Sequence, residues 1–243
     1  MPTSSEPLLT VVLATGNRHK AQEMRAILSD QVRCWTLDDF PGAPVVVEDA
    51  PTFAGNATKK SVQLAGWLGG EPSRNPKPRT RSLSVLADDS GLEVDALNGS
   101  PGVHSARFAA LDRSADVSSA RANSPDTANN AKLLRLLENV PLEKRTARFR
   151  CVLALTPIIS AKTGNHSPVC YANEAELQTQ LFEGVCEGRI SLAPSGAGGF
   201  GYDPLFVPNG YEQSFAELSE AEKNKISHRA NALQKMREWL DRK

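Results

Sequence analysis

The sequence predicts a mixed α/β fold, and three observations lead to this prediction. Short apolar runs of strand length alternate along the chain with segments whose apolar residues recur at helical spacing. Polar stretches rich in Gly, Asn, Ser and Pro separate these segments, as is typical of turns between strands and helices. The chain of 243 residues is also long enough to bury a large core, in one domain or in two closely packed lobes.

The first third of the chain predicts two strands, each followed by a helix. Residues 8–14 (LLTVVLA) have the apolar content of a buried strand, and residues 20–28 place Met24, Ile27 and Leu28 on one face of a helix. Residues 43–49 (APVVVED) predict a second strand that ends in two acids. Residues 52–68 predict a longer helix, whose expected buried face comprises Phe53, Ala57, Val62, Leu64, Ala65 and Leu68.

The middle of the chain predicts a strand pair between two long loops. Residues 85–97 (VLADDSGLEVDAL) predict a strand, a turn at Ser90-Gly91 and a second strand. Residues 71–84 hold three prolines and several basic residues, and residues 111–127 are polar and rich in small residues. We expect both segments to be loop insertions in a single domain that spans residues 1–243.

The last part of the chain predicts strands, a loop and helices in turn. The expected elements are a short helix over 129–140, strands over 146–157 and 179–190, and a glycine-dense loop over 195–206. Ser219 and Glu222 fit a capping box, and Ser227 can cap a final helix over 228–240.

Composition limits the classes of partner. The 28 Lys and Arg residues balance the 28 Asp and Glu residues, whereas nucleic-acid binders and membrane-surface binders usually carry a basic excess. Four separated cysteines without a C-x-x-C pair predict reduced thiols, and no apolar run is long enough to span a bilayer. Residues 8–14 lack a preceding basic region, so we expect no signal peptide. The sequence therefore predicts a cytoplasmic protein without a nucleic-acid or membrane partner.

The turn Thr15-Gly16-Asn17 with Lys20 is the first candidate site. It lies between an expected strand and an expected helix, where backbone N–H groups and a cation can hold an anion. The Walker pattern is missing. Taken alone, the pattern fits an ordinary Gly/Asn turn at least as well as an anion site.

The adjacent acids Asp88 and Asp89 are the second candidate site. Burial of two carboxylates at the end of a strand is costly unless a cation compensates them. In a regular strand they point to opposite faces, but a turn at Ser90-Gly91 can bring them together. Glu48 and Asp49 could complete a Mg²⁺ site. In isolation, two solvated turn acids remain the alternative.

The third and fourth candidates lie near the end of the chain. In residues 195–206 the glycines allow a ligand close approach, and Phe200 and Tyr202 offer flat faces for stacking on a base. The segment KNKISHR places Lys223, His228 and Arg229 around a helix boundary. A strand bulge and solvated side chains are the structural alternatives.

The five motifs together resemble those of the inosine triphosphate pyrophosphatase family, also called the Ham1 family, in its bacterial-type branch. They are LATGNRHK, TFAGNATKK, ADDSGLEVDALNGSPGVHSARFA, GGFGYDP and EKNKISHR, in this order. The resemblance covers nearly the whole chain except the two long loops and residues 162–176. It implies a long twisted mixed sheet flanked by helices, with two lobes and a central cleft, as in the ITPase/Maf-like fold. It also implies a homodimer, for which residues 98–109 are an interface candidate, with a core position for Phe108 as the alternative.

The resemblance implies a role for each matching residue. Asp89 takes the position of the proton acceptor and metal ligand, Asp88 and Lys20 join it as catalytic candidates, and Glu48 is the second metal ligand. The implied substrate-binding residues are Thr15, Gly16, Asn17, Arg18, His19, Lys20, Lys60, Ser90, Phe200, Gly201, Tyr202, Asp203, Lys223, His228 and Arg229. The family often has an acid before the helix asparagine, where this chain has Gly55 before Asn56. This departure favours Glu48 and the pair Asp88 and Asp89 as metal ligands and leaves their number open. Asp49 is an outside candidate.

The implied activity is hydrolysis of non-canonical purine nucleoside triphosphates (ITP, dITP and XTP) to the monophosphate and pyrophosphate, which cleanses the nucleotide pool. Mg²⁺, with Mn²⁺ as a substitute, is the implied cofactor. Arginine only donates hydrogen bonds, so Arg229 can bind a 6-oxo purine but cannot accept from the amino group of adenine. The alternatives are a Maf-type nucleotide pyrophosphatase with another base preference and a non-catalytic nucleotide-binding protein.

Overall fold

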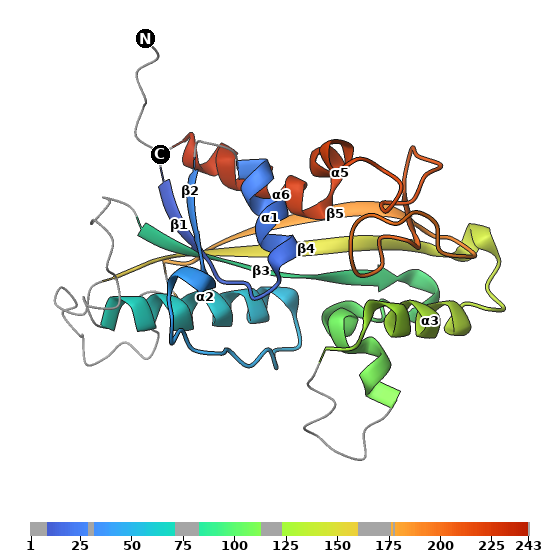
Figure 1. The fold of residues 1–243 in the computed structure, drawn as a ribbon, viewed down its shortest axis with the longest axis horizontal. Helices are drawn as coiled ribbons and strands as arrows, with labels where there is room; N and C mark the ends of the chain where they lie inside the picture. The colour runs from blue at the N-terminus through green and yellow to red at the C-terminus, as the bar shows by residue number, and fades with distance from the viewer. Residues whose placement is uncertain are drawn as a thin grey trace, which may run out of the picture. The chain divides into compact units, whose positions relative to one another are not determined.

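The computed structural model describes residues 9–28, 32–70, 83–112, 123–159, 176 and 178–242. It contains one mixed sheet of six strands in the order β2-β1-β3-β4-β5-β6 (Figure 1). The strands are β1 (Leu9–Leu13), β2 (Val32–Thr36), β3 (Leu83–Val94), β4 (Thr146–Pro157), β5 (Gln180–Ile190) and β6 (Phe206–Pro208). The strand β1 pairs with β2 and β3 in parallel, whereas β5 and β6 are antiparallel. The mixed α/β prediction is confirmed.

Five α-helices lie among the described residues, with several short 3₁₀ segments. The helices are α1 (Arg18–Leu28), α2 (Phe53–Gly70), α3 (Asp126–Leu136), α5 (Glu220–Ile226) and α6 (His228–Leu240). The 3₁₀ segments are η2 (Leu37–Asp39), η4 (Asp95–Leu97), η5 (Gly102–Asp112) and η7 (Leu142–Lys144). None of these helices has the length and hydropathy of a membrane span.

The chain divides into two compact units. The first comprises Met1–Asp89 and Val152–Phe182, and the second comprises Ser90–Cys151 and Glu183–Lys243. Single-domain organisation and the implied cleft stay predictions.

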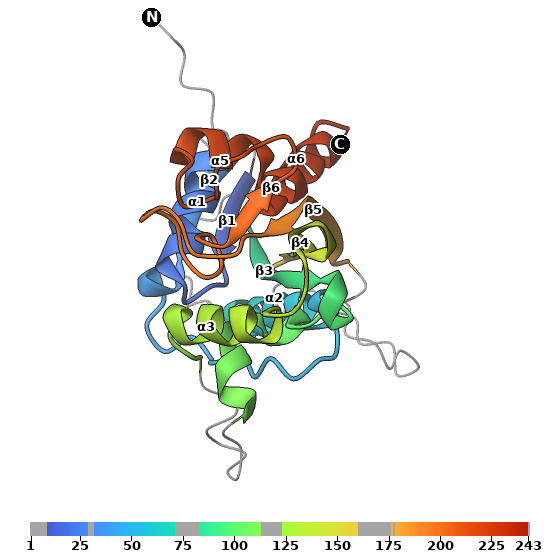
Figure 2. The same ribbon diagram turned by 90° about the vertical axis from the view of Figure 1, so that its right-hand side faces the viewer.

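In the first unit, strand alternation distributes two helices over two faces. Val12 and Val85 pack with Leu64 and Leu68 of α2 in one hydrophobic cluster. The alternate residues of β1, Val11 among them, point to the other face and are fully buried. The helix α1 lies on the opposite side of β1 from α2 in both views (Figures 1 and 2).

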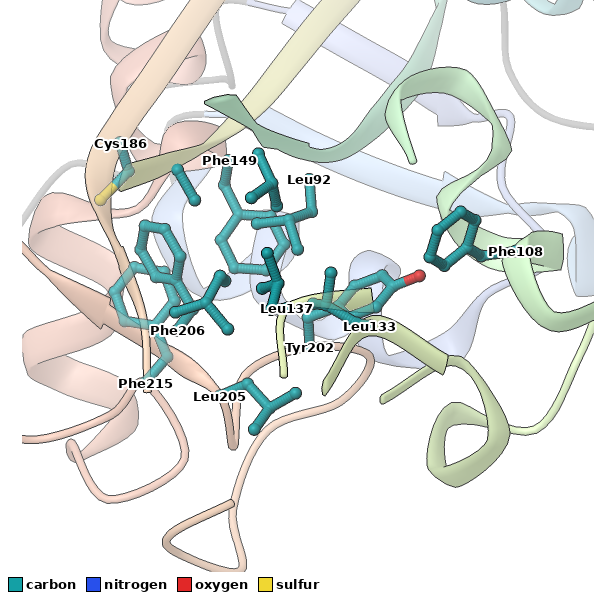
Figure 3. Close-up of a cluster of buried hydrophobic side chains, with 13 residues drawn as sticks. Leu92, Phe108, Leu133, Leu137, Phe149, Cys186, Tyr202, Leu205, Phe206 and Phe215 are labelled. Carbon is teal, nitrogen blue, oxygen red and sulfur yellow. The ribbon is translucent and has the colours of Figure 1, made fainter. Parts of the chain in front are cut away.

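In the second unit, α3 lies on one side of the strands, and α5 and α6 lie on the other (Figures 1 and 2). The core of this unit joins β3, η5, α3, β4, β5, β6 and the glycine-dense loop through a cluster of thirteen buried residues (Figure 3). Phe206 and Phe215 pack on Phe149 with ring centroids 4.7 and 5.9 Å away. Phe108 belongs to this cluster and is 5% exposed, so its core interpretation is confirmed.

Helix boundaries were well predicted at the C-terminal end. The hydroxyl of Ser219 accepts from the N–H of Glu222 at 3.2 Å, and that of Ser227 accepts from the N–H of Ala230 at 3.1 Å. These caps start α5 and α6 at the predicted residues, and Ser227 also ends α5.

Two strand predictions were wrong. Residues 43–50 form no strand, and Val45 is 96% exposed. The second strand is instead β2, an edge strand whose charged and half-buried residues gave no apolar signal. The strand β3 also continues through Ser90 and Gly91 without the expected turn, which keeps the side chains of Asp88 and Asp89 on opposite faces.

The remaining predictions concern loops and thiols. Residues 71–82 and 113–122 lie outside the described residues, and so does Cys170. The expected loops were too long at their ends, because Leu83 and Ser84 belong to β3 and Leu111 and Asp112 belong to η5. In the described part of the chain Cys34 and Cys186 are free thiols, as expected.

Gly184 of β5 allows α6 to pack directly on the strand. A Cβ atom at this position would overlap the backbone of His228 and Ala232. We expect Gly184→Ala to lower the free energy of unfolding by about 1–3 kcal/mol, because the helix must move away. Gly66→Ala on α2 is the matched control, since a Cβ there meets nothing within 4 Å and should be neutral or stabilising. Urea denaturation of both variants measures the effect, and equal stabilities would contradict this close approach.

Candidate functional site

The turn after β1 is closed by its own side chains. The hydroxyl of Thr15 accepts from the N–H of Asn17 at 3.1 Å, and Asn17 Oδ1 accepts from the N–H groups of His19 and Lys20 at 3.0 and 3.2 Å. Asn17 thereby caps α1 and orients its first turn. These three N–H groups are bonded within the turn, so the ammonium group of Lys20 is its main feature for anion binding.

Lys20 and Asp88 form a buried ion pair. The Lys20 ammonium donates to Asp88 Oδ1, and the Asp88 side chain is fully buried. The lysine side chain is 17% exposed. Because the carboxylate is enclosed and paired, the structure places Asp88 as the partner of Lys20 and not beside Asp89.

Lys60 connects the other acids of the site. Its ammonium lies 2.7 Å from Glu48 Oε2, 2.6 Å from the backbone oxygen of Asp88 and 3.7 Å from Asp89 Oδ1. Burial opposes the charge of Lys60, but the carboxylates of Asp89 and Glu48 outweigh it and raise its pKa. We call Lys20, Glu48, Lys60, Asp88 and Asp89, together with Asn56, the acid–lysine cluster. All of its members belong to the first unit.

The pKa of Asp89 is raised. Burial raises its pKa to about 6, against the opposing charges of Lys60 and Lys20. Its Oδ2 atom accepts from the Asn56 amide at 3.1 Å. A buried carboxyl group with a pKa near neutrality is typical of residues that ligate metals or move protons.

The donor set fits a hard divalent cation. Within the described ranges no group of three or more His, Cys, Asp or Glu side chains is placed to hold a metal ion. However, the single ammonium of Lys60 reaches the carboxylates of both Glu48 and Asp89, so one cationic centre can reach both acids. Mg²⁺ is commonly held by one or two carboxylates, with substrate phosphates and water as further ligands. Asp49 instead pairs with Lys59 at 2.5 Å on the surface.

The second unit holds a basic–aromatic cluster of Ser90, Phe200, Asp203, Lys223 and Arg229. Asp203 Oδ2 accepts from the Phe200 N–H at 2.8 Å and from the Lys223 ammonium at 2.7 Å. The Lys223 ammonium lies 4.8 Å from the centroid of the Phe200 ring, and the Arg229 guanidinium lies 5.9 Å from it. Arg229 also donates to the Ser90 hydroxyl at 3.1 Å. The arrangement puts two cations beside one half-buried aromatic ring.

Three other residues predicted to bind the substrate, Gly201, Tyr202 and His228, lie outside the basic–aromatic cluster. Tyr202 is 4% exposed, and its ring lies in the hydrophobic cluster, where its hydroxyl donates to the Ser105 carbonyl at 2.9 Å (Figure 3). This placement contradicts the expected stacking role of Tyr202. His228 is buried and stacks on Phe149 at 4.8 Å. The N–H of Gly201 is held by Asp126 at 2.7 Å.

Sequence reasoning did not identify Asn56 as a site residue. It is 1% exposed and bonds both Asp89 and the N–H of Ala50. The available signal was a polar residue on the apolar face of the helix over 52–68, next to Ala57.

Comparisons with known proteins identify similar chains along nearly the full length. The Ham1 family model matches residues 11–239. The chain is 43% identical to a dITP/XTP pyrophosphatase of Desulforamulus reducens, over 96% of both chains. It is 42% identical to one of Geobacillus kaustophilus, over 94% of this chain and 92% of the relative. The structure of a HAM1 protein from Coxiella burnetii matches with a TM-score of 0.73 and 33% identity, over 97% of this chain and all of that one.

The burial of Asp89 predicts a pH-dependent stability. Below the ordinary pKa of 3.8 the Asp89 carboxyl is protonated in both the folded and the unfolded chain, so its burial costs no charge. Above a pH of about 6 the carboxyl is ionised in both states, so folding buries a charge and stability is lower. At pH 7.5 and without metal, we expect the free energy of unfolding of Asp89→Asn to be about 1–3 kcal/mol higher than that of wild type. The difference should shrink toward pH 4. Asp49→Asn, at an exposed ion pair, should show no such gain, and a destabilised Asp89→Asn variant at pH 7.5 would contradict the assignment.

Proposed function

The chain belongs to the Ham1 family, and we infer that it is a nucleoside triphosphate pyrophosphatase acting on non-canonical purine nucleotides, including ITP, dITP and XTP. It hydrolyses the α–β phosphoanhydride, releases the monophosphate and pyrophosphate, and so cleanses the nucleotide pool. The observation that carries this conclusion is the acid–lysine cluster, in which buried Asp89 lies with Lys60 and Glu48. These groups match the chemistry of a triphosphate and a divalent cation.

The lysines supply positive charge to the triphosphate. We propose that Lys20 and Lys60 bind phosphate oxygens. Electrostatic stabilisation of this kind usually contributes most to catalysis of phosphoryl transfer. Asp88 accepts a hydrogen bond from the ammonium of Lys20, so this cation has a defined position in the cluster.

Asp89 is the residue that we propose for chemistry. Its Oδ1 atom can ligate the cation or take the proton of the attacking water. Pyrophosphatases of the Ham1 family generally depend on a metal ion, and we propose Mg²⁺, with Mn²⁺ as a substitute, held by Glu48 and Asp89. The metal supplies a Lewis acid that screens the charge of the phosphates.

The basic–aromatic cluster is the proposed site for the base. Phe200 supplies a ring face, and Arg229 supplies donors for the 6-oxo group of inosine or xanthosine. Adenine presents an amino group there, which offers no acceptor to the arginine donors, and this mismatch disfavours adenine. Lys223 and Asp203 hold the Phe200 backbone in place.

We further propose that the enzyme is a cytoplasmic homodimer. The free thiols of Cys34 and Cys186 agree with a reducing compartment. Residues 98–109 are the interface candidate. In this segment the side chain of His104 is exposed, whereas that of Phe108 is buried in the core. Light scattering at micromolar concentration tests the dimer, and the molar mass of a monomer would contradict this proposal.

The activity is tested by incubating the protein with ITP, GTP, dTTP and Mg²⁺ and quantifying pyrophosphate. We expect release from ITP well above that from GTP or dTTP. Preferred cleavage of dTTP would instead indicate a Maf-type pyrophosphatase, and binding without cleavage of any nucleotide would indicate a non-catalytic protein.

Asp89→Asn should lower kcat for ITP by about 100-fold or more, because the substitution removes a negative charge and a proton acceptor. Equilibrium ITP binding should persist, since the phosphate lysines are unchanged. Asp49→Asn should keep the wild-type kcat. A near wild-type kcat in folded Asp89→Asn would contradict this role of Asp89 and make Glu48 or Asp88 the candidate catalytic residue.

Arg229→Ala should reduce kcat/KM for ITP by about 10- to 100-fold, the value of a hydrogen bond from a charged group. It should also reduce the preference for ITP over ATP. Arg145→Ala is the matched control, because Arg145 is buried but donates to the backbone carbonyls of Leu137, Val140 and Ser191. This control should lose stability and retain the preference. An unchanged preference in Arg229→Ala would assign base recognition to His228.

A further inference from the structure

Asn56 uses both ends of its buried amide. Its Oδ1 atom accepts from the N–H of Ala50 at 2.9 Å, and its Nδ2 atom donates to Asp89 Oδ2 at 3.1 Å. The reversed orientation would set a donor against the N–H and an acceptor against the carboxylate. The two partners therefore fix the orientation of the amide.

The contact with Asp89 distinguishes the two oxygens of that carboxylate. Oδ2 is bonded to Asn56, whereas Oδ1 lies 3.7 Å from the Lys60 ammonium. Because Asn56 is only 1% exposed, it has little freedom to follow a moving carboxylate. Oδ1 is thereby the oxygen that faces the cationic side of the cluster.

The hydrogen bond from the Ala50 N–H to Asn56 holds the segment that carries Glu48. Residues 43–50 form neither helix nor strand, and Ala50 stands two residues after Glu48. Gly55 permits this close packing, since a Cβ there would lie 2.8 Å from the Ala50 Cβ. Thr52 caps the first turn of α2 by accepting from the Gly55 N–H at 3.1 Å, so the helix end that presents Asn56 is itself fixed.

We propose that Asn56 is a positioning residue that sets the separation of Glu48 and Asp89 and turns Asp89 Oδ1 toward the metal ion. The identity of the two carboxylates as metal ligands rests on the proposed function. Groups that hold metal ligands in place typically contribute 10- to 100-fold to metal affinity or activity. A purely structural Asn56 would affect stability alone.

The first experiment compares Asn56→Ala with Asn129→Ala. Asn129 is also a buried helix asparagine, 2% exposed, and its amide bonds backbone groups of Ala106 and Ala109. We expect both variants to lose stability, but only Asn56→Ala should weaken Mn²⁺ binding by the nucleotide-free protein, by about 10-fold or more. Its kcat for ITP should fall about 10- to 100-fold, with KM within about threefold of wild type. Equal Mn²⁺ affinity in wild type and folded Asn56→Ala, or no Mn²⁺ binding by wild type, would overturn the proposal.

A double-mutant cycle with Asp89→Asn tests whether Asn56 acts through Asp89. We expect Asn56→Ala to cause no further loss of kcat in the Asp89→Asn background, because the carboxylate that it orients is gone. Additive losses would overturn the proposal. If Asn56→Ala does not fold, Asn56→Asp is measured instead, since it preserves the volume and the acceptor for Ala50 but removes the donor to Asp89. Should wild type release no pyrophosphate from ITP, the proposed function fails, while the Mn²⁺ comparison still decides the role of Asn56.

Discussion

The burial of two consecutive carboxylates in the middle of β3 is the constraint on which the first unit depends. Asp88 and Asp89 are 1% and 7% exposed, and an unpaired carboxylate at such a place would cost several kcal/mol. Because neighbouring residues of a strand point to opposite faces, one cation cannot serve both side chains directly. The fold provides Lys20 from α1 for Asp88 and Lys60 from α2 for Asp89, and these helices lie on opposite sides of β1.

This division gives the two acids different roles. Asp88 is fully buried and pairs with Lys20. Asp89 keeps a raised pKa and a carboxylate oxygen beside Lys60, while Asn56 occupies the other oxygen. The lysines therefore compensate two buried carboxylates, and in the proposed function the same ammonium groups bind the triphosphate.

The second unit uses a buried carboxylate in the same way. Asp203 is 3% exposed and binds the Lys223 ammonium and the Phe200 N–H through one oxygen. Tyr202, between Phe200 and Asp203 in sequence, anchors the glycine-dense loop in the hydrophobic core (Figure 3). Tyr202 and Asp203 are therefore buried, while the ring of Phe200 stays half exposed. The contacts of these two buried residues hold Phe200 in place within the glycine-dense loop.

By itself, the sequence determined the order of most elements and the charged members of the acid–lysine cluster. An apolar run identified β1, β-branched and aromatic content identified β4 and β5, and helical spacing identified α2. Side-chain caps identified α5 and α6. All of these signals are local to each segment. Five ordered motifs predicted Lys20, Lys60 and Asp89 for the cluster. Only the tertiary structure decided that the apolar run at 43–50 stays outside the sheet, that β3 runs through Ser90-Gly91, and that Tyr202 is core. It also decided that Asn56 bonds Asp89. The physical reason is that strand pairing, burial and hydrogen-bond partners depend on residues far apart in the chain, which no local pattern records.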